Sequence, residues 1–203
     1  TEDVALIGNG VNSTVIDAAG IDRVLHIMSG VTADLSDLTI RNGDVDGEGG
    51  GILNSGILTI TSITVTGNTG KDSGGIFNDG TLTSSNSVIS NNTTVYGGIV
   101  SGIHNTGSMT LIASVVENND VDNGGVGGIK NFGDLTIKQS SIRNVRGYFA
   151  GGLANFGTLS ISNSSITDNR GPSAGGIYND TGGVTTIKHS TISGNYGNGS
   201  SAG

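Results

Sequence analysis

The chain has 203 residues, a formal net charge of −8, no Cys, a single Pro and 37 Gly. An acidic chain offers no basic field for phosphate groups, so nucleic acid is not an expected partner. The lack of Cys excludes disulfides and thiolate metal sites, and no stretch approaches the roughly 18 apolar residues of a membrane helix, so no membrane span is expected.

In chain order, we expect residues 1–30 to form one or more degenerate rungs and residues 31–196 to form a series of regular repeats. Residues 197–203 are expected to be a flexible tail or a truncated further rung. The repeats share a "GGI" motif with an Asn two residues after the Ile, and successive Asn residues are 24, 27, 26, 24 and 24 positions apart. They are Asn54, Asn78, Asn105, Asn131, Asn155 and Asn179. A fixed period of this size indicates a solenoid or an array.

Within each repeat, apolar residues alternate with Ser and Thr. In "TLSISNSSITDN", Leu159, Ile161 and Ile166 follow this pattern, which is typical of strands with one buried face. Helical spacing is absent, and the content of Gly, Ser, Thr and Asn opposes helix. We therefore expect an all-β fold, a right-handed single-stranded parallel β-helix (β-solenoid) of about eight rungs of 24–27 residues, in one domain over residues 1–196.

Stacked rungs would place equivalent residues above one another. One aliphatic column is expected to contain Ile52, Ile76, Ile103, Ile129, Leu153 and Ile177. The Asn column two residues later is expected to form a ladder that faces inward or lies at a bend, because each amide can donate to one neighbouring rung and accept from the other.

A second register carries Val or Ile with an Asn three residues later, as in "ISNN" and "ITDN", and only Val145 departs from it. Together, the "GGI" and "IxxN" motifs resemble the polymorphic outer-membrane protein repeat and related right-handed β-helix proteins that bacteria export. The resemblance covers roughly residues 31–196, although that family commonly has Phe where this chain has Ile or Val. It implies a surface-exposed adhesive or structural role, and it brings no catalytic residues.

The sequence favours no catalytic or metal centre, and no cofactor is expected. Outward columns contain mostly Thr and Ser, whereas a lyase or glycosidase would gather acids there. Glu117 and Arg143 on adjacent rungs predict an exposed ion pair. Two loops, residues 43–50 and 119–125, carry Asp residues two positions apart, which leaves Ca²⁺ as an alternative to solvated turn acids.

One region has an unusual concentration of aromatic residues. Phe132 and Phe156 follow the ladder Asn on neighbouring rungs, and the loop between them adds Tyr148 and Phe149. An exposed cluster of this kind predicts a contact site for a partner, with sugar stacking as a second use. The alternative is that the loop covers the two Phe rings locally.

Neither end of the repeat carries an evident cap, and open rungs are unpaired sheet edges that invite another chain. The sequence therefore predicts a non-enzymatic structural protein that is extracellular or at the cell surface. We expect a fibre subunit or adhesin-like stalk that forms a homo-oligomer or head-to-tail filament, or that joins further domains of a longer chain. A carbohydrate-binding or polysaccharide-degrading β-helix is the alternative, and ice binding by the Thr columns is a weaker one.

Overall fold

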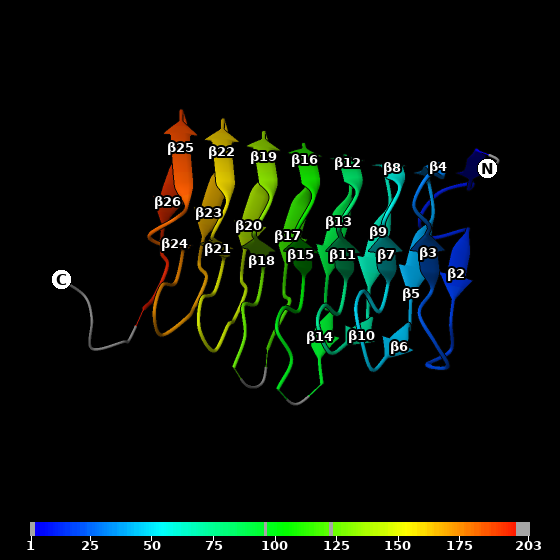
Figure 1. Ribbon diagram of the computed structural model, residues 1–203, viewed down its shortest axis with the longest axis horizontal. Coiled ribbons are helices and arrows are strands. Elements are labelled where there is room, and N and C mark those ends of the chain that lie inside the picture. Colours follow the sequence, from blue (N-terminus) through cyan, green and yellow to red (C-terminus); the bar gives the residue numbers. More distant parts are fainter. Residues whose placement is uncertain (1–2, 96, 122–123, 198–203) are drawn as a thin grey trace.

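The chain winds into an elongated coil in which every strand lies beside its equivalents in the neighbouring rungs (Figure 1). The structure is a computed structural model that describes residues 3–95, 97–121 and 124–197. Over these ranges all strand pairings are parallel and no helix is present, which confirms the all-β parallel β-solenoid. Of the predicted tail, residues 198–203 lie outside the described ranges.

Two sheets are eight strands deep and the third is seven, so the described residues make about seven full turns. The first sheet contains β1 (Val4–Ile7), β4 (Thr32–Ser36), β8 (Ile57–Thr61), β12 (Thr81–Ser85), β16 (Ser108–Ile112), β19 (Asp134–Lys138), β22 (Thr158–Ser162) and β25 (Val184–Lys188). The second contains β2 (Val15–Asp17), β5 (Thr39–Arg41), β9 (Thr64–Thr66), β13 (Val88–Ser90), β17 (Val115–Glu117), β20 (Ser141–Arg143), β23 (Ser165–Thr167) and β26 (Thr191–Ser193).

The third sheet is built from the "GGI" segments, and a small fourth sheet accompanies it in three rungs. The third sheet contains β3 (Leu25–Ile27), β7 (Ile52–Asn54), β11 (Ile76–Asn78), β15 (Ile103–Asn105), β18 (Ile129–Asn131), β21 (Leu153–Asn155) and β24 (Ile177–Asn179). The fourth contains β6 (Asp44–Val45), β10 (Thr69–Gly70) and β14 (Thr93–Thr94).

The chain turns between the first and second sheets through one residue in the left-handed region. This corner column has positive φ at Asp37, Ser62, Asn86, Ala113, Gln139, Asn163 and His189. Asn and Asp tolerate this conformation better than most residues with a side chain, which explains why they occupy several of these corner positions. Ala113, with φ of 48°, is the member least suited to it.

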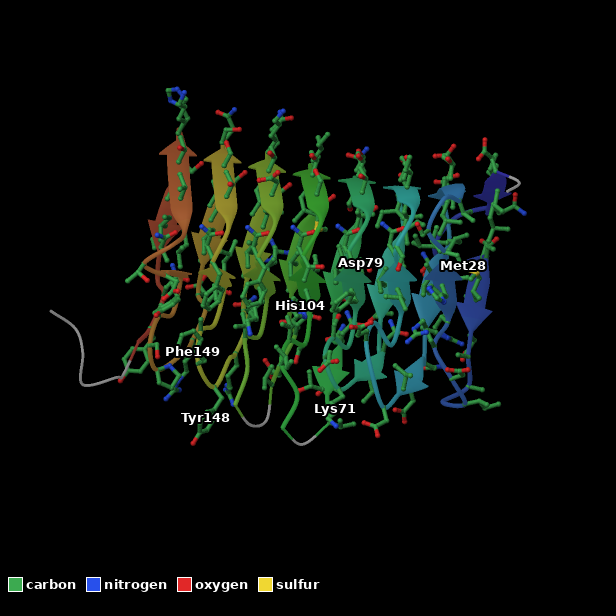
Figure 2. The ribbon with its side chains drawn as sticks, in the orientation of Figure 1. Met28, Lys71, Asp79, His104, Tyr148 and Phe149 are labelled. Atoms are coloured by element: carbon green, nitrogen blue, oxygen red, sulfur yellow. The ribbon has the colours of Figure 1, made fainter. Side chains whose placement is uncertain are left out.

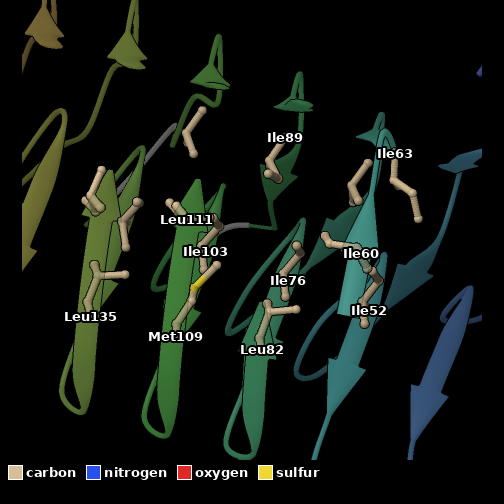
Figure 3. Close-up of a cluster of buried hydrophobic side chains, with 14 of the residues drawn as sticks. Ile52, Ile60, Ile63, Ile76, Leu82, Ile89, Ile103, Met109, Leu111 and Leu135 are labelled. Atoms are coloured by element: carbon tan, nitrogen blue, oxygen red, sulfur yellow. The ribbon is translucent and has the colours of Figure 1, made fainter. Parts of the chain in front are cut away.

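The core consists of stacked aliphatic columns, as the repeat predicts. Ile76 pairs in register with Ile52 on one side and Ile103 on the other, and all three are fully buried (Figure 3). Leu82 and Met109 are likewise neighbours in a second column. Because each side chain lies above a similar one, the interior is filled without long-range packing between unlike elements.

The right hand of the coil stays a prediction from the general rule for parallel crossovers. In the described ranges no helix is both long and apolar enough to cross a membrane.

Candidate functional site

The inward face of the third sheet carries an unbroken asparagine ladder. Each Nδ2 donates to the Oδ1 of the Asn in the next rung: the distances are 2.7 Å from Asn54 to Asn78, 2.7 Å from Asn78 to Asn105, 2.7 Å from Asn105 to Asn131, 2.8 Å from Asn131 to Asn155 and 2.9 Å from Asn155 to Asn179. The same amides also donate to backbone carbonyls, as Asn105 does to Gly107 and Asp134. All members except the exposed Asn179 are fully buried, so these bonds offset the cost of burying an amide.

A second asparagine ladder lies at the end of the second sheet, where the sequence showed a spacing but no ladder was predicted. The Nδ2 of Asn68 donates to the Oδ1 of Asn92 at 2.9 Å, and Asn92 donates to Asn119 at 3.1 Å. Val145 interrupts the ladder, which resumes between Asn169 and Asn195 at 3.0 Å. The "IxxN" motif was the signal that could have predicted it.

On the outward face of the third sheet, aromatic rings form a continuous row that we call the aromatic stripe. The ring centroids are 4.9 Å apart for Phe77 and His104, 5.7 Å for His104 and Phe132, 4.8 Å for Phe132 and Phe156, 6.1 Å for Phe156 and Tyr178, and 4.6 Å for Tyr178 and Phe149. Phe132 and Phe156 are stacked with an interplanar angle of 20°. The stripe therefore runs along the coil across successive rungs, from the rung of Phe77 to that of Tyr178.

The four residues predicted as a contact site have different surroundings. Phe132 is 47% exposed, while Phe156 and Phe149 are half-buried, so the loop covers the Phe pair only in part. Tyr148 is 60% exposed at the outer edge of that loop, whereas Phe149 lies nearer the coil (Figure 2). Tyr148 is in none of the ring contacts of the described residues.

The sequence analysis missed three members of the stripe and the lysine beside them. Phe77, His104, Lys130 and Tyr178 occupy one register position, the residue before the ladder Asn. The signal was present in "GGIFN", "SGIHN", "GGIKN" and "GGIYN", but unlike residues at one position do not stand out as a column.

Lys130 and His104 give the stripe its electrostatic character. The Nζ of Lys130 lies 5.0 Å from the ring centroid of Phe132 and 5.5 Å from that of Phe156, within cation–π range. Burial lowers the pKa of Lys130. His104 is buried and neither ring nitrogen has a hydrogen-bond partner in the described structure; burial, and then the charge of Lys130, lower its pKa to about 4. A backbone contact with Asp72 acts on this pKa in the opposite direction.

A hollow of about 200 Å³ lies beside Lys130. Phe149 and Phe156 line it, together with the glycine-rich loop segments 97–99 and 124–126. The Cβ of any larger residue at Gly125 would lie 2.4 Å from the carbonyl oxygen of Ile99, so glycine is needed where these loops approach each other. One small cavity is thus lined by a lysine and two aromatic residues.

The predicted ion pair and the two Asp-containing loops show no sign of a catalytic or metal site among the described residues. Arg143 and Glu117 form the expected ion pair, with 2.7 Å between Nη2 and Oε2. In the loop 43–50, Asp46 is exposed and lies 3.7 Å from Lys71, whereas Asp122 of the other loop falls outside the described residues. Among residues 3–95, 97–121 and 124–197, no three His, Cys, Asp or Glu side chains gather as metal ligands would.

The Thr and Ser columns that prompted the ice-binding alternative lie on the first and second sheets, and the longer one is on the outer face of the first sheet. The column contains Thr59, Thr83, Thr110, Thr136, Ser160 and Thr186. The next outward column toward the second sheet includes Ile112 and Lys138, so the face is not uniformly threonine. Ice binding stays a prediction.

Comparison of the chain with protein-family models, with curated proteins and with solved structures gives no match. The resemblance to the polymorphic outer-membrane protein repeat therefore rests on the "GGI" and "IxxN" motifs and stays a prediction. The parallel β-solenoid rests on the strand register described above.

Proposed function

We propose that this chain is a non-enzymatic structural module, a rod-like segment of an extracellular fibre or adhesin-like stalk that assembles head to tail. One observation carries the proposal: the core columns run to both ends of the coil and are exposed there. In one column Leu6 is 38% exposed at the first rung and Ile187 is 41% exposed at the last, whereas Ile161 between them is buried.

The two ends also match in register. Leu6 and Ile187 belong to one column of the first sheet, and Ile16 and Ile192 belong to one column of the second. A second copy that continued the coil would place Leu6 against Ile187 and Ile16 against Ile192, as apolar neighbours stack inside each molecule. It would also pair the free edges of the outermost strands, and each hydrogen bond gained would contribute about 0.5 to 1.5 kcal/mol.

The assembly is tested by substitutions that place a charge on an end or on a side wall. Ile187→Lys alters the last rung, whereas Ile57→Lys places the same charge on an exposed side-wall residue of the first sheet. Light scattering and electron microscopy should give elongated oligomers for the wild type and for Ile57→Lys, and monomers for the end variant. A wild type that stays monomeric at high concentration would contradict assembly between copies and leave the rod as part of a longer chain.

The same proposal expects no turnover of polysaccharide. Outward columns such as that of Thr83 and Thr110 carry hydroxyls rather than the paired carboxylates of glycoside hydrolysis. Pectin, alginate and related polymers should release no reducing or unsaturated ends, with or without Ca²⁺. Reproducible release would overturn the non-enzymatic assignment and favour the polysaccharide-degrading alternative.

A further inference from the structure

The hollow beside Lys130 differs from the rest of the side wall in shape and charge. It lies on the outward face of the third sheet, away from the end rungs that the proposed assembly uses. Its volume of about 200 Å³ is below the 300 to 1,000 Å³ typical of sites for drug-sized ligands. It therefore suits a ligand group of about one ring.

Among the described residues, the lysine at this hollow has aromatic neighbours but no carboxylate to balance its charge. Within the part of the chain that the structure describes, no carboxylate lies at salt-bridge distance from Lys130. Its contacts are the faces of Phe132 and Phe156, and burial lowers its pKa. An anionic ligand group would complete this environment, because an opposite charge favours the protonated form of a lysine.

The ring of Phe156 supplies the second part of a binding site. It stacks on Phe132 and lines the hollow together with Phe149. The apolar C–H face of a pyranose can pack on such a ring. A phosphate group would make little use of the ring, and a chain with net charge −8 has an unfavourable overall field for polyanions, which favours a ligand with one charge.

We propose that this hollow binds a single acidic sugar residue, whose carboxylate pairs with the Lys130 ammonium while its ring packs against Phe149 and Phe156, the two aromatic residues that line the hollow. The site would add to the rod the recognition of saccharides that present one uronic-acid residue. It is separate from head-to-tail assembly, because none of its residues belongs to an end rung.

Two methyl glycosides test the proposal directly. Methyl glucuronoside and methyl glucoside share one ring and differ by the carboxylate, and titration by calorimetry or NMR measures both affinities. We expect the wild type to bind the glucuronoside about tenfold more tightly, in line with a hydrogen bond between charged groups. Lys130→Met should abolish this preference, and Phe156→Leu should weaken both sugars.

Lys138→Met is the matched control, because Lys138 is an exposed lysine of the same rung on the first sheet. It should bind both sugars as the wild type does, and circular dichroism should show that all variants keep the β fold. Absence of saturable glucuronoside binding by the wild type would overturn the proposal. Equal affinity for the two sugars, or an unchanged preference in Lys130→Met, would overturn it as well.

Discussion

The third sheet carries two neighbouring columns, one of which repeats the same residue while the other changes from rung to rung. The inward column is Asn in six successive rungs, whereas the position one residue earlier holds Leu53, Phe77, His104, Lys130, Ala154 and Tyr178. Both columns share the same strands and the same backbone hydrogen bonds. Only the direction of the side chain differs, because successive residues of a strand point to opposite faces.

The contrast shows where a repeat is constrained. An inward amide has only the rung above and the rung below as partners, so a change at one rung leaves groups unpaired at two others. The outward side chains have no such ladder, and residues of different size and charge occupy this column even where loops bury them, as at Phe77 and His104. Invariance in this fold therefore marks structure, and variation marks the places where a binding site can arise.

The largest expected effect comes from breaking the inward column. Asn131→Leu should lower the free energy of unfolding by about 3 kcal/mol, because the Asn105 donor and the Asn155 acceptor lose their partner in a buried setting. Urea denaturation measures it. Lys130→Met, one residue away on the outward face, should change stability by no more than about 1 kcal/mol, since it removes cation–π contacts and leaves no buried polar group unpaired. Equal losses in the two variants would contradict the contrast between the columns.

A pH dependence is expected from the buried outward histidine. The pKa of His104 is about 4 in the folded chain, below the 6.5 of an unperturbed histidine, so the unfolded chain binds the proton more readily. The contribution of His104 to stability is therefore complete above pH 6.5 and falls as the pH drops toward 4, by about 2 kcal/mol at pH 5.

His104→Phe isolates this contribution, since Phe77 already fills the same column one rung earlier. Between pH 6.5 and 4, the free energy of unfolding measured by urea denaturation should fall more steeply with decreasing pH in the wild type than in this variant. Parallel curves would show that His104 accepts a proton in the folded state without cost.

The interrupted second ladder offers a repair. Val145→Asn should stabilise the chain by about 1 kcal/mol, because the new amide can bond with Asn119 on one side and Asn169 on the other. Val145→Thr, which keeps the branched shape without the amide, should give no gain. Thermal unfolding measures both, and a loss of stability in Val145→Asn would mean that apolar packing matters more than the ladder at this rung.

The smallest effect is expected at the corner column, where the backbone rather than a neighbour sets the preference. Ala113 has a φ of 48°, and Asn86 and Asn163 hold the equivalent corners. Ala113→Asn should stabilise by about 0.5 kcal/mol, and Ala113→Val should destabilise by about 1 kcal/mol, because a β-branched residue tolerates this region poorly. Chemical denaturation of the two variants provides the check.

The same contrast explains what could be predicted from the sequence. The columns of Ile76 and Asn78 were predictable because stacking demands like residues at a fixed period. The aromatic stripe was predicted only at Phe132, Phe149 and Phe156, because its other members are unlike residues at one register position. The hollow could not be predicted, since it depends on how the loops at Gly97 and Gly124 fold over the sheet.

Differences in rung length fall mostly in one segment, which links the second sheet to the third. From the first sheet to the second the distance along the chain is constant: Leu82 precedes Ile89 by 7 residues, and equivalent positions are 7 residues apart in every rung from Leu58 to Ile192. From the second sheet to the third it varies, with 11 residues from Val65 to Ile76 and 14 from Ile89 to Ile103. Extra residues there leave the strand register unchanged, and doubling a loop costs only about 0.6 kcal/mol in closure entropy. This edge of the coil is thus a natural insertion site, where a foreign peptide could be displayed at a spacing fixed by the rungs.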